Sequence, residues 1–300
     1  MSTQDKSMRW VVGLDLRPHC HGAINFAVWL RQHYRGGQLK IDGLHVVENA
    51  LFELPESPPR AELLGGAKKA AHAAVLTRDA TEAFSTIDVV AGEQVTDMLA
   101  AAGKLEATTG LILGRRAAAE DRALIRLGKV ARRLLRRLEV PTFVVPPDLE
   151  LKHIGPGPIV CAVDLDERGV ELARFGEQLA ARLGRDARLV HVIDSSDPIG
   201  LQYLPEGTWN VLHARTPDDG QAALAAWREA AGLSARALLA QGQIVPKLVS
   251  AARELDACMI LCGSRRLSLA ERLWISSVGS SLAAAAHLPV GVVPSQSESD

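Results

Sequence analysis

The residues best suited to chemistry lie in the stretch 259–293, where a loop of small and polar residues separates two apolar runs. Gly263 ends the first run, Arg266 follows it, and Ser276 and Ser277 stand just before an alanine-rich segment. Unpaired backbone N–H groups and the helix dipole point to the place where a strand ends and a helix begins, so α/β proteins hold anions there. The pattern therefore predicts a strand, an anion-binding loop, a helix and a second strand.

The chain contains an internal duplication, because four motifs occur twice in the same order at offsets of 146 to 149 residues. Each match is weak alone, but the shared order and spacing indicate a repeat. The matched segments are 10–15 with 159–164, 44–47 with 190–193, 111–116 with 260–266, and 140–146 with 288–294. Between the copies, 146–158 is rich in proline and glycine, which interrupt helices and central strands. We therefore predict a first domain at 1–148, a linker at 149–157 and a second domain at 158–300.

Short apolar runs alternate with helix-like segments in both halves. The runs are continuous, which is typical of strands buried on both faces of a parallel sheet. We expect helices at 21–33, 61–84, 95–102, 129–138 and 172–183. The alternation predicts an α/β fold with a doubly wound parallel sheet in each half, whose ligands bind beyond the carboxyl ends of the strands. Asp15 and Asp164 end the first strand of each half, and Gly114 and Gly263 end later strands. These residues are expected to meet at that edge.

The ordered set of motifs resembles the universal stress proteins, and both halves share the resemblance, so the chain looks like a tandem universal stress protein. The features that carry it are a first strand ending in aspartate, a Leu-His-Val-Val strand, an apolar strand ending in glycine, a helix start of small residues and a closing Pro-Val-x-Val-Val. The resemblance implies a Rossmann-like, five-stranded parallel sheet per domain, of the adenine nucleotide alpha hydrolase-like type. It also implies that the domains pair as a pseudo-dimer through their last strands, at 142–145 and 290–293.

Some universal stress proteins bind ATP through a Gly-x2-Gly-x9-Gly-(Ser/Thr) loop, with the aspartate and the residue after the second-strand histidine near the adenosine. The resemblance therefore implies a nucleotide site, with ATP and Mg²⁺ as the expected ligand, in either half. In the second half the implied residues are Asp164, Val192, Gly263, Arg266, Ser276, Ser277 and Val278. In the first half they are Asp15, Val46, Gly114 and Gly128.

Both loops depart from the family pattern. In the second half the spacing is intact, but Arg266 and Ser276 replace two glycines. An arginine fills the space that glycine leaves for a phosphate, although its guanidinium binds anions itself. In the first half Ala117 replaces the second glycine, and Gly128 comes one residue late and precedes a lysine. We therefore expect the second half to be the better site, and we expect the insertion to shift the first-half helix away from its strand.

Other candidate groups have simpler structural interpretations. His19, Cys20 and His21 are metal-capable, but three consecutive ligands rarely converge on one ion, so we expect no metal site. His45 and His191 are expected to be satisfied in the core or in a pocket wall. Four arginines share one predicted helix with buried leucines and are expected to form a solvated face, at positions 132, 133, 136 and 137. The loops 48–60 and 195–216 are long, irregular and apolar, and such loops usually cover something. We expect 198–212 to lie over the second-half pocket or to pack at a domain or subunit contact.

Composition limits the class of protein. The chain has 300 residues, is 47% apolar and has a formal net charge of −1, which gives no general attraction to nucleic acid or to anionic membranes. The polar N-terminus does not read as a signal peptide, and no apolar run approaches the roughly 20 residues of a membrane helix. Four cysteines without disulfide or zinc spacing favour a reducing cytoplasm.

Three functions remain open. The first is a non-enzymatic stress-response protein that binds ATP or a related anion in its second domain and acts through unidentified protein partners. The second is an interaction scaffold whose loops have lost nucleotide binding. The third is a weak nucleotide hydrolase, which is disfavoured because no acid/base pair or metal cluster is readable. A monomer and a homodimer of tandem chains both agree with the sequence.

Overall fold

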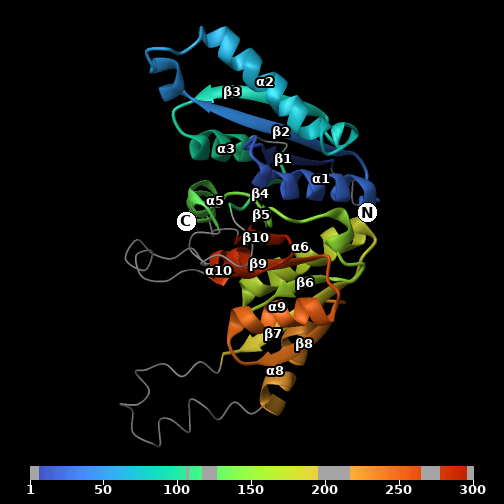
Figure 1. Ribbon diagram of the computed structural model, residues 1–300. Coiled ribbons are helices and arrows are strands. Elements are labelled where there is room, and N and C mark those ends of the chain that lie inside the picture. Colours follow the sequence, from blue (N-terminus) through green and yellow to red (C-terminus); the bar gives the residue numbers. More distant parts are fainter. Residues whose placement is uncertain (1–6, 106–107, 117–126, 195–216, 265–277, 296–300) are drawn as a thin grey trace, which may run out of the picture.

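The computed structural model describes residues 7–105, 108–116, 127–194, 217–264 and 278–295. Within these residues, ten strands form one continuous sheet in the order β3-β2-β1-β4-β5-β10-β9-β6-β7-β8 (Figure 1). Every neighbouring pair is parallel except β5 and β10, which run antiparallel. Each half thus contributes a five-stranded parallel sheet with the same strand order. The predicted pairing through the last strands is confirmed.

The strands and helices alternate along the chain as the sequence predicts. The first-half strands are β1 Met8–Gly13, β2 Leu39–Glu48, β3 Thr86–Gly92, β4 Gly110–Gly114 and β5 Thr142–Val145. The second-half strands are β6 Ile159–Ala162, β7 Ala187–Ile193, β8 Arg236–Gln241, β9 Met259–Ser264 and β10 Val290–Pro294. The helices are α1 His21–His33, α2 Arg60–Leu76, α3 Val95–Lys104, α5 Lys129–Leu135, α6 Glu167–Leu183, α8 Pro217–Ala230, α9 Ile244–Glu254 and α10 Val278–Ala285. Short 3-10 turns are η1 Pro18–Cys20, η2 Asn49–Glu53, η3 Thr81–Ala83 and η4 Leu151–His153.

Helices cover both faces of the sheet. Side chains of α1, α2, α6 and α8 pack into one hydrophobic core. Side chains of α3, α5, α9 and α10 pack into a second core on the other face. Each core contains residues from both halves of the chain, so the two halves share their hydrophobic interior.

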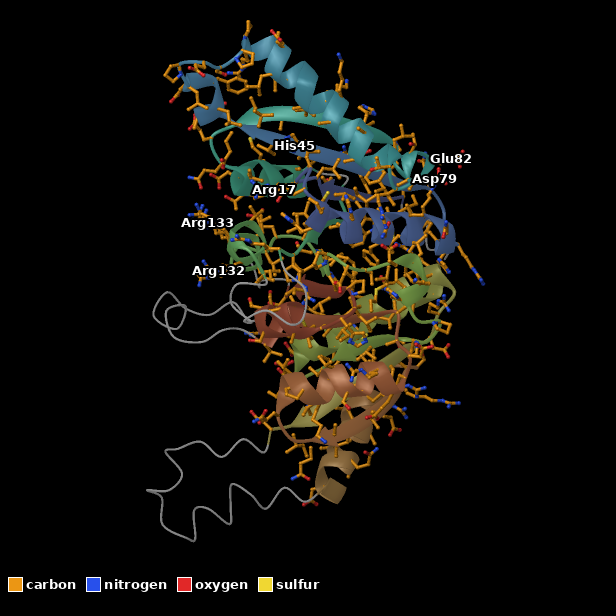
Figure 2. All side chains as sticks on the ribbon, viewed as in Figure 1. Arg17, His45, Asp79, Glu82, Arg132 and Arg133 are labelled. Atoms are coloured by element: carbon orange, nitrogen blue, oxygen red, sulfur yellow. The ribbon has the colours of Figure 1, made fainter. Side chains whose placement is uncertain are left out.

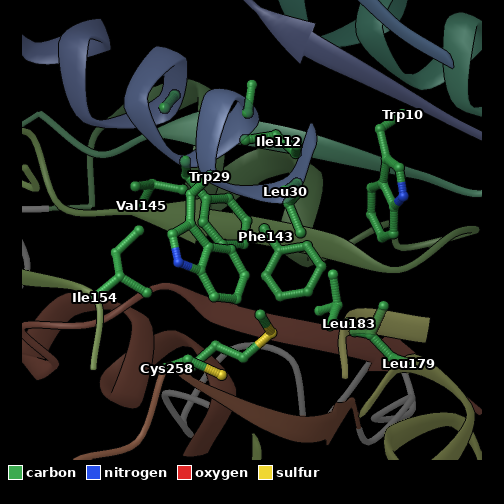
Figure 3. Close-up of a cluster of buried hydrophobic side chains, with 14 of the residues drawn as sticks. Trp10, Trp29, Leu30, Ile112, Phe143, Val145, Ile154, Leu179, Leu183 and Cys258 are labelled. Atoms are coloured by element: carbon green, nitrogen blue, oxygen red, sulfur yellow. The ribbon is translucent and has the colours of Figure 1, made fainter. Parts of the chain in front are cut away.

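Trp10, Trp29 and Phe143 of the first half lie in the hydrophobic cluster shown in Figure 3. The ring of Phe143, on β5, lies 5.2 Å from that of Trp10 and 5.2 Å from that of Phe26, measured between centroids. Gly291 of β10 stands opposite Phe143 in the antiparallel register. A Cβ atom on Gly291 would lie 2.6 Å from the Phe143 ring and 2.6 Å from Leu261, so close packing requires glycine there.

Several predicted element boundaries are wrong. The helix expected at 61–84 ends at Leu76, because Asp79 adopts a left-handed backbone (φ 52°) and Ala80 N–H donates back to Val75 O. The first strand ends at Gly13 rather than at Asp15, and β6 ends at Ala162 rather than at Asp164. Leu14 N–H still bonds to β2, but Leu16 has φ 57° and turns the chain away from the sheet.

The segment predicted as a linker, 149–157, is packed against the first half. Leu149 and Ile154 are buried, and η4 lies between them. Asn25 of α1 donates to Leu149 O at 2.7 Å, and Arg78 donates to both carboxylate oxygens of Glu150 at 2.8 and 2.9 Å. These bonds fix the path of the chain from β5 to β6.

The arginine-rich segment at and beyond α5 has the predicted orientation. Leu134, Leu135 and Leu138 are buried, whereas the four arginines at 132, 133, 136 and 137 are exposed. This confirms a solvated basic face; nucleic-acid binding there stays untested.

All four cysteines are free thiols and all are buried. Because they are buried, we expect them to resist thiol reagents in the native protein. Burial raises the pKa of Cys161, Cys258 and Cys262 to about 12 and also raises that of Cys20, so little reactive thiolate is present near pH 8. Ellman's reagent should titrate four thiols in urea and react far more slowly without it. Rapid labelling of native protein that disappears in Cys20→Ser would contradict burial at that position.

Candidate functional site

A cavity of about 1040 Å³ lies in the first half, at the carboxyl ends of β1, β2 and β4. The first turns of α2 form one side, and residues of α3 and α5 form the other. Strand register explains why the predicted residues meet here, since Gly13 pairs with Leu44 on one side and with Leu113 on the other. Asp15, Val46 and Gly114 follow these positions, and all three line the cavity.

Asp15 is held by its neighbours at the edge of the cavity. Its Oδ2 lies 2.7 Å from His19 Nε2, and its Oδ1 lies 3.5 Å from Arg17 Nε. The carboxylate nevertheless remains about half exposed, with 51% of the side-chain surface accessible. It therefore keeps acceptor capacity for hydroxyl or amine donors of a ligand. The left-handed backbone of Leu16, which is unfavourable for a branched side chain, sets the direction of this loop.

His45 anchors the loop that carries Asp15. Its Nδ1 lies 2.7 Å from Leu14 O, and because a carbonyl only accepts, Nδ1 carries the proton of that bond. His45 also lines the cavity. His191 makes the equivalent bond to Val163 O at 2.8 Å in the second half. The prediction that both histidines are satisfied wall or core residues is confirmed.

The two first-half glycines serve packing and backbone conformation. A Cβ atom on Gly114 would lie 2.8 Å from His19 O, so glycine is needed for the close approach of η1. Gly128 precedes α5 as its N-cap with φ 76°, against Arg116, and is not among the cavity-lining residues. Val130 and Ala131, in the first turn of α5, line the cavity instead. Helix α5 begins directly after Gly128. The predicted shift of this helix away from its strand would be judged against the second-half loop, which lies outside the described residues.

Charged side chains surround the mouth of this cavity. Its basic side chains are Arg17 and Lys69, and its carboxylates are Asp15, Glu48 and Glu62. In Figure 2 His45 and Arg17 lie toward the carboxyl ends of the strands, whereas Asp79 and Glu82 lie at the opposite edge. Among the described residues, no group of three His, Cys, Asp or Glu side chains is arranged to hold a metal ion.

The second-half residues are only partly described. Ala162 of β6 pairs with Val190 and with Cys262, so Asp164, Val192 and Gly263 follow neighbouring strands to the same edge. Val278, at the start of the described part of α10, is exposed. Arg266, Ser276 and Ser277 lie outside the described residues, as does the apolar segment 195–216. The predicted second-half phosphate loop therefore stays a prediction.

The sequence did not reveal the α2 wall of the first-half cavity. Leu63, Gly65 and Gly66 line it, together with Leu51 and Pro58 from the preceding segment. Of the apolar residues in 48–60, Leu51 reaches the cavity, whereas Leu54 is exposed and does not line it. The adjacent glycines inside a helical segment were the available signal for the rest, because helix interiors disfavour glycine.

Comparisons with known proteins agree with this architecture. Universal stress protein MJ0531 of Methanocaldococcus jannaschii is 26% identical over 138 residues, which span 45% of this chain and 80% of that protein. The crystal structure of a universal stress protein from Archaeoglobus fulgidus matches with a TM-score of 0.64 at 15% identity, covering 98% of this chain and all of that one. A functionally unknown protein from Pseudomonas aeruginosa matches with a TM-score of 0.61 at 14% identity, covering 97% and 93%. These two structures show the shared fold.

None of the helices in the described part of the chain has the length and apolar character of a membrane span. The model of the universal stress protein family matches the sequence twice, at residues 7–146 and at residues 157–294. The two matches cover most of the chain and correspond to the two five-stranded halves of the sheet. The chain therefore belongs to the universal stress protein family, and it carries two copies of that domain in tandem.

Proposed function

We propose that this chain is a non-enzymatic, cytoplasmic stress-response protein that binds an adenine nucleotide and acts through protein partners. The observation that carries the proposal is the first-half cavity, which opens where doubly wound sheets bind their ligands. The cytoplasmic assignment rests on the four free cysteines. Pockets of this kind combine apolar walls with a few polar groups that fix orientation.

The cavity fits the nucleoside end of a nucleotide better than the triphosphate end. Val46, Leu113 and Val130 offer apolar surface for a base, and the half-exposed Asp15 offers acceptors for ribose hydroxyls. Arg17 at the mouth offers charge for phosphate. The glycine-rich phosphate loop of the family pattern is missing here, so the proposal for this half extends to adenine nucleotides generally and is not limited to Mg-ATP. When bound, Mg²⁺ would supply charge neutralisation for the phosphates.

The test combines co-purification with titration. Protein denatured after purification should release an adenine nucleotide, and added ATP, ADP or AMP should raise the melting temperature. A ligand at 100 times its dissociation constant adds about 2.7 kcal/mol to the free energy of unfolding. Absence of both effects for all three nucleotides would sink the proposal.

Two matched variants assign the site to one half. Asp15→Asn should abolish the nucleotide-induced shift if the first-half cavity is the site, while Asp164→Asn leaves it unchanged. The reverse result would support the second-half site implied by the family pattern. Asparagine preserves the size of each side chain, so a change in binding is separable from a change in packing.

Degenerate phosphate loops favour a second candidate, an interaction scaffold without a nucleotide. This reading predicts no melting shift but retained association with protein partners. A hydrolase would instead release phosphate in proportion to protein concentration, and the release would disappear in Asp164→Ala. We propose that no such activity exists, and a phosphate-release assay at high protein concentration decides the matter.

A further inference from the structure

The first half of α2 stands over the cavity instead of packing into the core. The only buried residues of this helix are Ala71 and Val75, both in its C-terminal half. Every residue from 60 to 70 is exposed or half-buried. Leu63 lines the cavity. A helix normally buries one apolar face, but Leu63 and Leu64 in the first turns of α2 are only half-buried.

Gly65 and Gly66 line the cavity on the α2 side, and neither packing nor backbone conformation requires glycine at these positions. A Cβ atom built on either residue would meet no atom within 4 Å. Neither has a positive φ, so the backbone does not require glycine. Glycine inside a helix is unfavourable relative to alanine. The pair therefore weakens α2 and gains no packing within the protein, while it widens the cavity on that side.

The α2 side of the cavity combines apolar surface with charged side chains. Near the ends of β1 and β4, Asp15, Arg17 and His19 provide charged and hydrogen-bonding groups. Near α2, Leu51 and Leu63 provide apolar surface beside the charged Glu62 and Lys69, and Leu51 is 45% exposed. Exposed apolar surface inside a concave site indicates a binding surface.

We propose that the first-half cavity takes an adenine nucleotide that carries an apolar acyl group, with the acyl group lying under α2. This inference rests on the proposed function, because the nucleotide part would occupy the strand-end region described above. The cavity volume of about 1040 Å³ lies at the upper limit of the roughly 300–1,000 Å³ typical of small-molecule sites, which leaves room beyond a nucleoside. Binding is non-covalent and requires no reaction.

Octanoyl-coenzyme A is a suitable probe, with coenzyme A and octanoate as matched controls. Its flexible arm allows the acyl group to reach α2 whichever way the nucleotide lies. Because burying two methylene groups already accounts for about tenfold in affinity, octanoyl-coenzyme A should bind at least tenfold more tightly than coenzyme A in isothermal titration. Octanoate alone should bind more weakly than either.

Gly66→Leu tests the place of the acyl group. The added side chain would project from α2 into the cavity, and leucine is favourable in a helix, so the fold should be retained. The variant should bind octanoyl-coenzyme A no more tightly than it binds coenzyme A, so the acyl advantage disappears. Ala73→Leu is the matched control, because Ala73 is exposed on the same helix and does not line the cavity. It should behave as the natural protein.

Each outcome decides the inference. Nucleotide binding with no acyl advantage overturns it and leaves the proposed function standing. An acyl advantage that survives Gly66→Leu overturns the assigned place. If ATP, ADP, AMP and coenzyme A all fail to bind, both the inference and the proposed function are overturned.

Discussion

Replacing Phe143 with alanine is expected to lower the free energy of unfolding by about 3–5 kcal/mol. The side chain is fully buried at the junction of the two halves, where its ring contacts Trp10 and Phe26. Its partner in β10 is Gly291, which has no side chain to move into the vacated space. The resulting cavity would therefore stay largely empty, and an unfilled cavity adds to the lost transfer energy.

The measurement is urea unfolding followed by tryptophan fluorescence and by far-ultraviolet circular dichroism. Phe143→Leu is the control, because leucine retains most of the apolar contact and should recover more than half of the loss. Both probes should shift together, since the cores beneath and above the sheet contain residues of both halves. A loss below about 1 kcal/mol for the alanine variant, or a shift in one probe only, would contradict a shared core at this junction.

The inner strands of the fold were predictable from sequence, whereas the outer strands were not. Inner strands such as β4 and β9 are buried on both faces, so they appear as continuous apolar runs that the repeat makes visible. The outermost strands, β3 and β8, lie at the sheet edges and alternate exposed with partly buried residues. Their apolar runs, at 89–91 and 237–240, are not among the four matched motifs, and only the family resemblance implied five strands per half.

Helix boundaries followed the same physics. Helix α6 begins at Glu167, five residues before the apolar spacing that predicted it, because Asp166 caps it by accepting a bond from Gly169 N–H at 2.8 Å. Gly184, with φ 62°, ends it. Capping residues extend a helix beyond its apolar stripe, so an estimate from the stripe alone was too short.

The sequence predicted only those residues of the candidate site that lie at or just after the end of a recognisable strand. Asp15 and Val46 were found because each occupies a fixed place after a recognisable strand. The α2 wall was missed, because spacing along a helix does not show that its first turns overhang a sheet edge. Loop spacing favoured the second half, yet the cavity observed in the described residues depends on how α2 and α5 close over the first half.

Arg115 joins the two domains by hydrogen bonds to the last turn of α10. It follows Gly114 at the end of β4 and is 1% exposed. One of its guanidinium nitrogens donates to Ala283 O at 3.2 Å and to Ala284 O at 2.5 Å, at the C-terminus of α10. A cation at this end of a helix satisfies terminal carbonyls and complements the dipole. The residue after Gly263 is Ser264, which is too short to make the equivalent contact.

Arg115→Met is expected to cost about 3 kcal/mol of unfolding free energy, the upper end for hydrogen bonds that involve a charged group, because two buried carbonyls lose a donor together. Arg115→Lys should recover part of this loss, since lysine keeps the charge but not the planar fork. Arg116→Met is the matched control: Arg116 is the exposed neighbour, so its loss should stay within about 0.5 kcal/mol. Equal losses for the two methionine variants would show that Arg115 has no special role.

His287 provides an independent readout of the same contact. Its pKa lies below the ordinary value of 6.5 because of desolvation, and because Arg253 and Arg115 repel its protonated form. The folded state thus binds this proton less tightly than the unfolded state. The stability that neutral His287 contributes is complete above about pH 6.5 and is lost as the pH falls through the folded pKa. Arg115→Met should raise the pKa of His287 in an NMR titration, whereas Arg116→Met should leave it unchanged. An unmoved pKa in Arg115→Met would mean that the guanidinium does not act on this helix end.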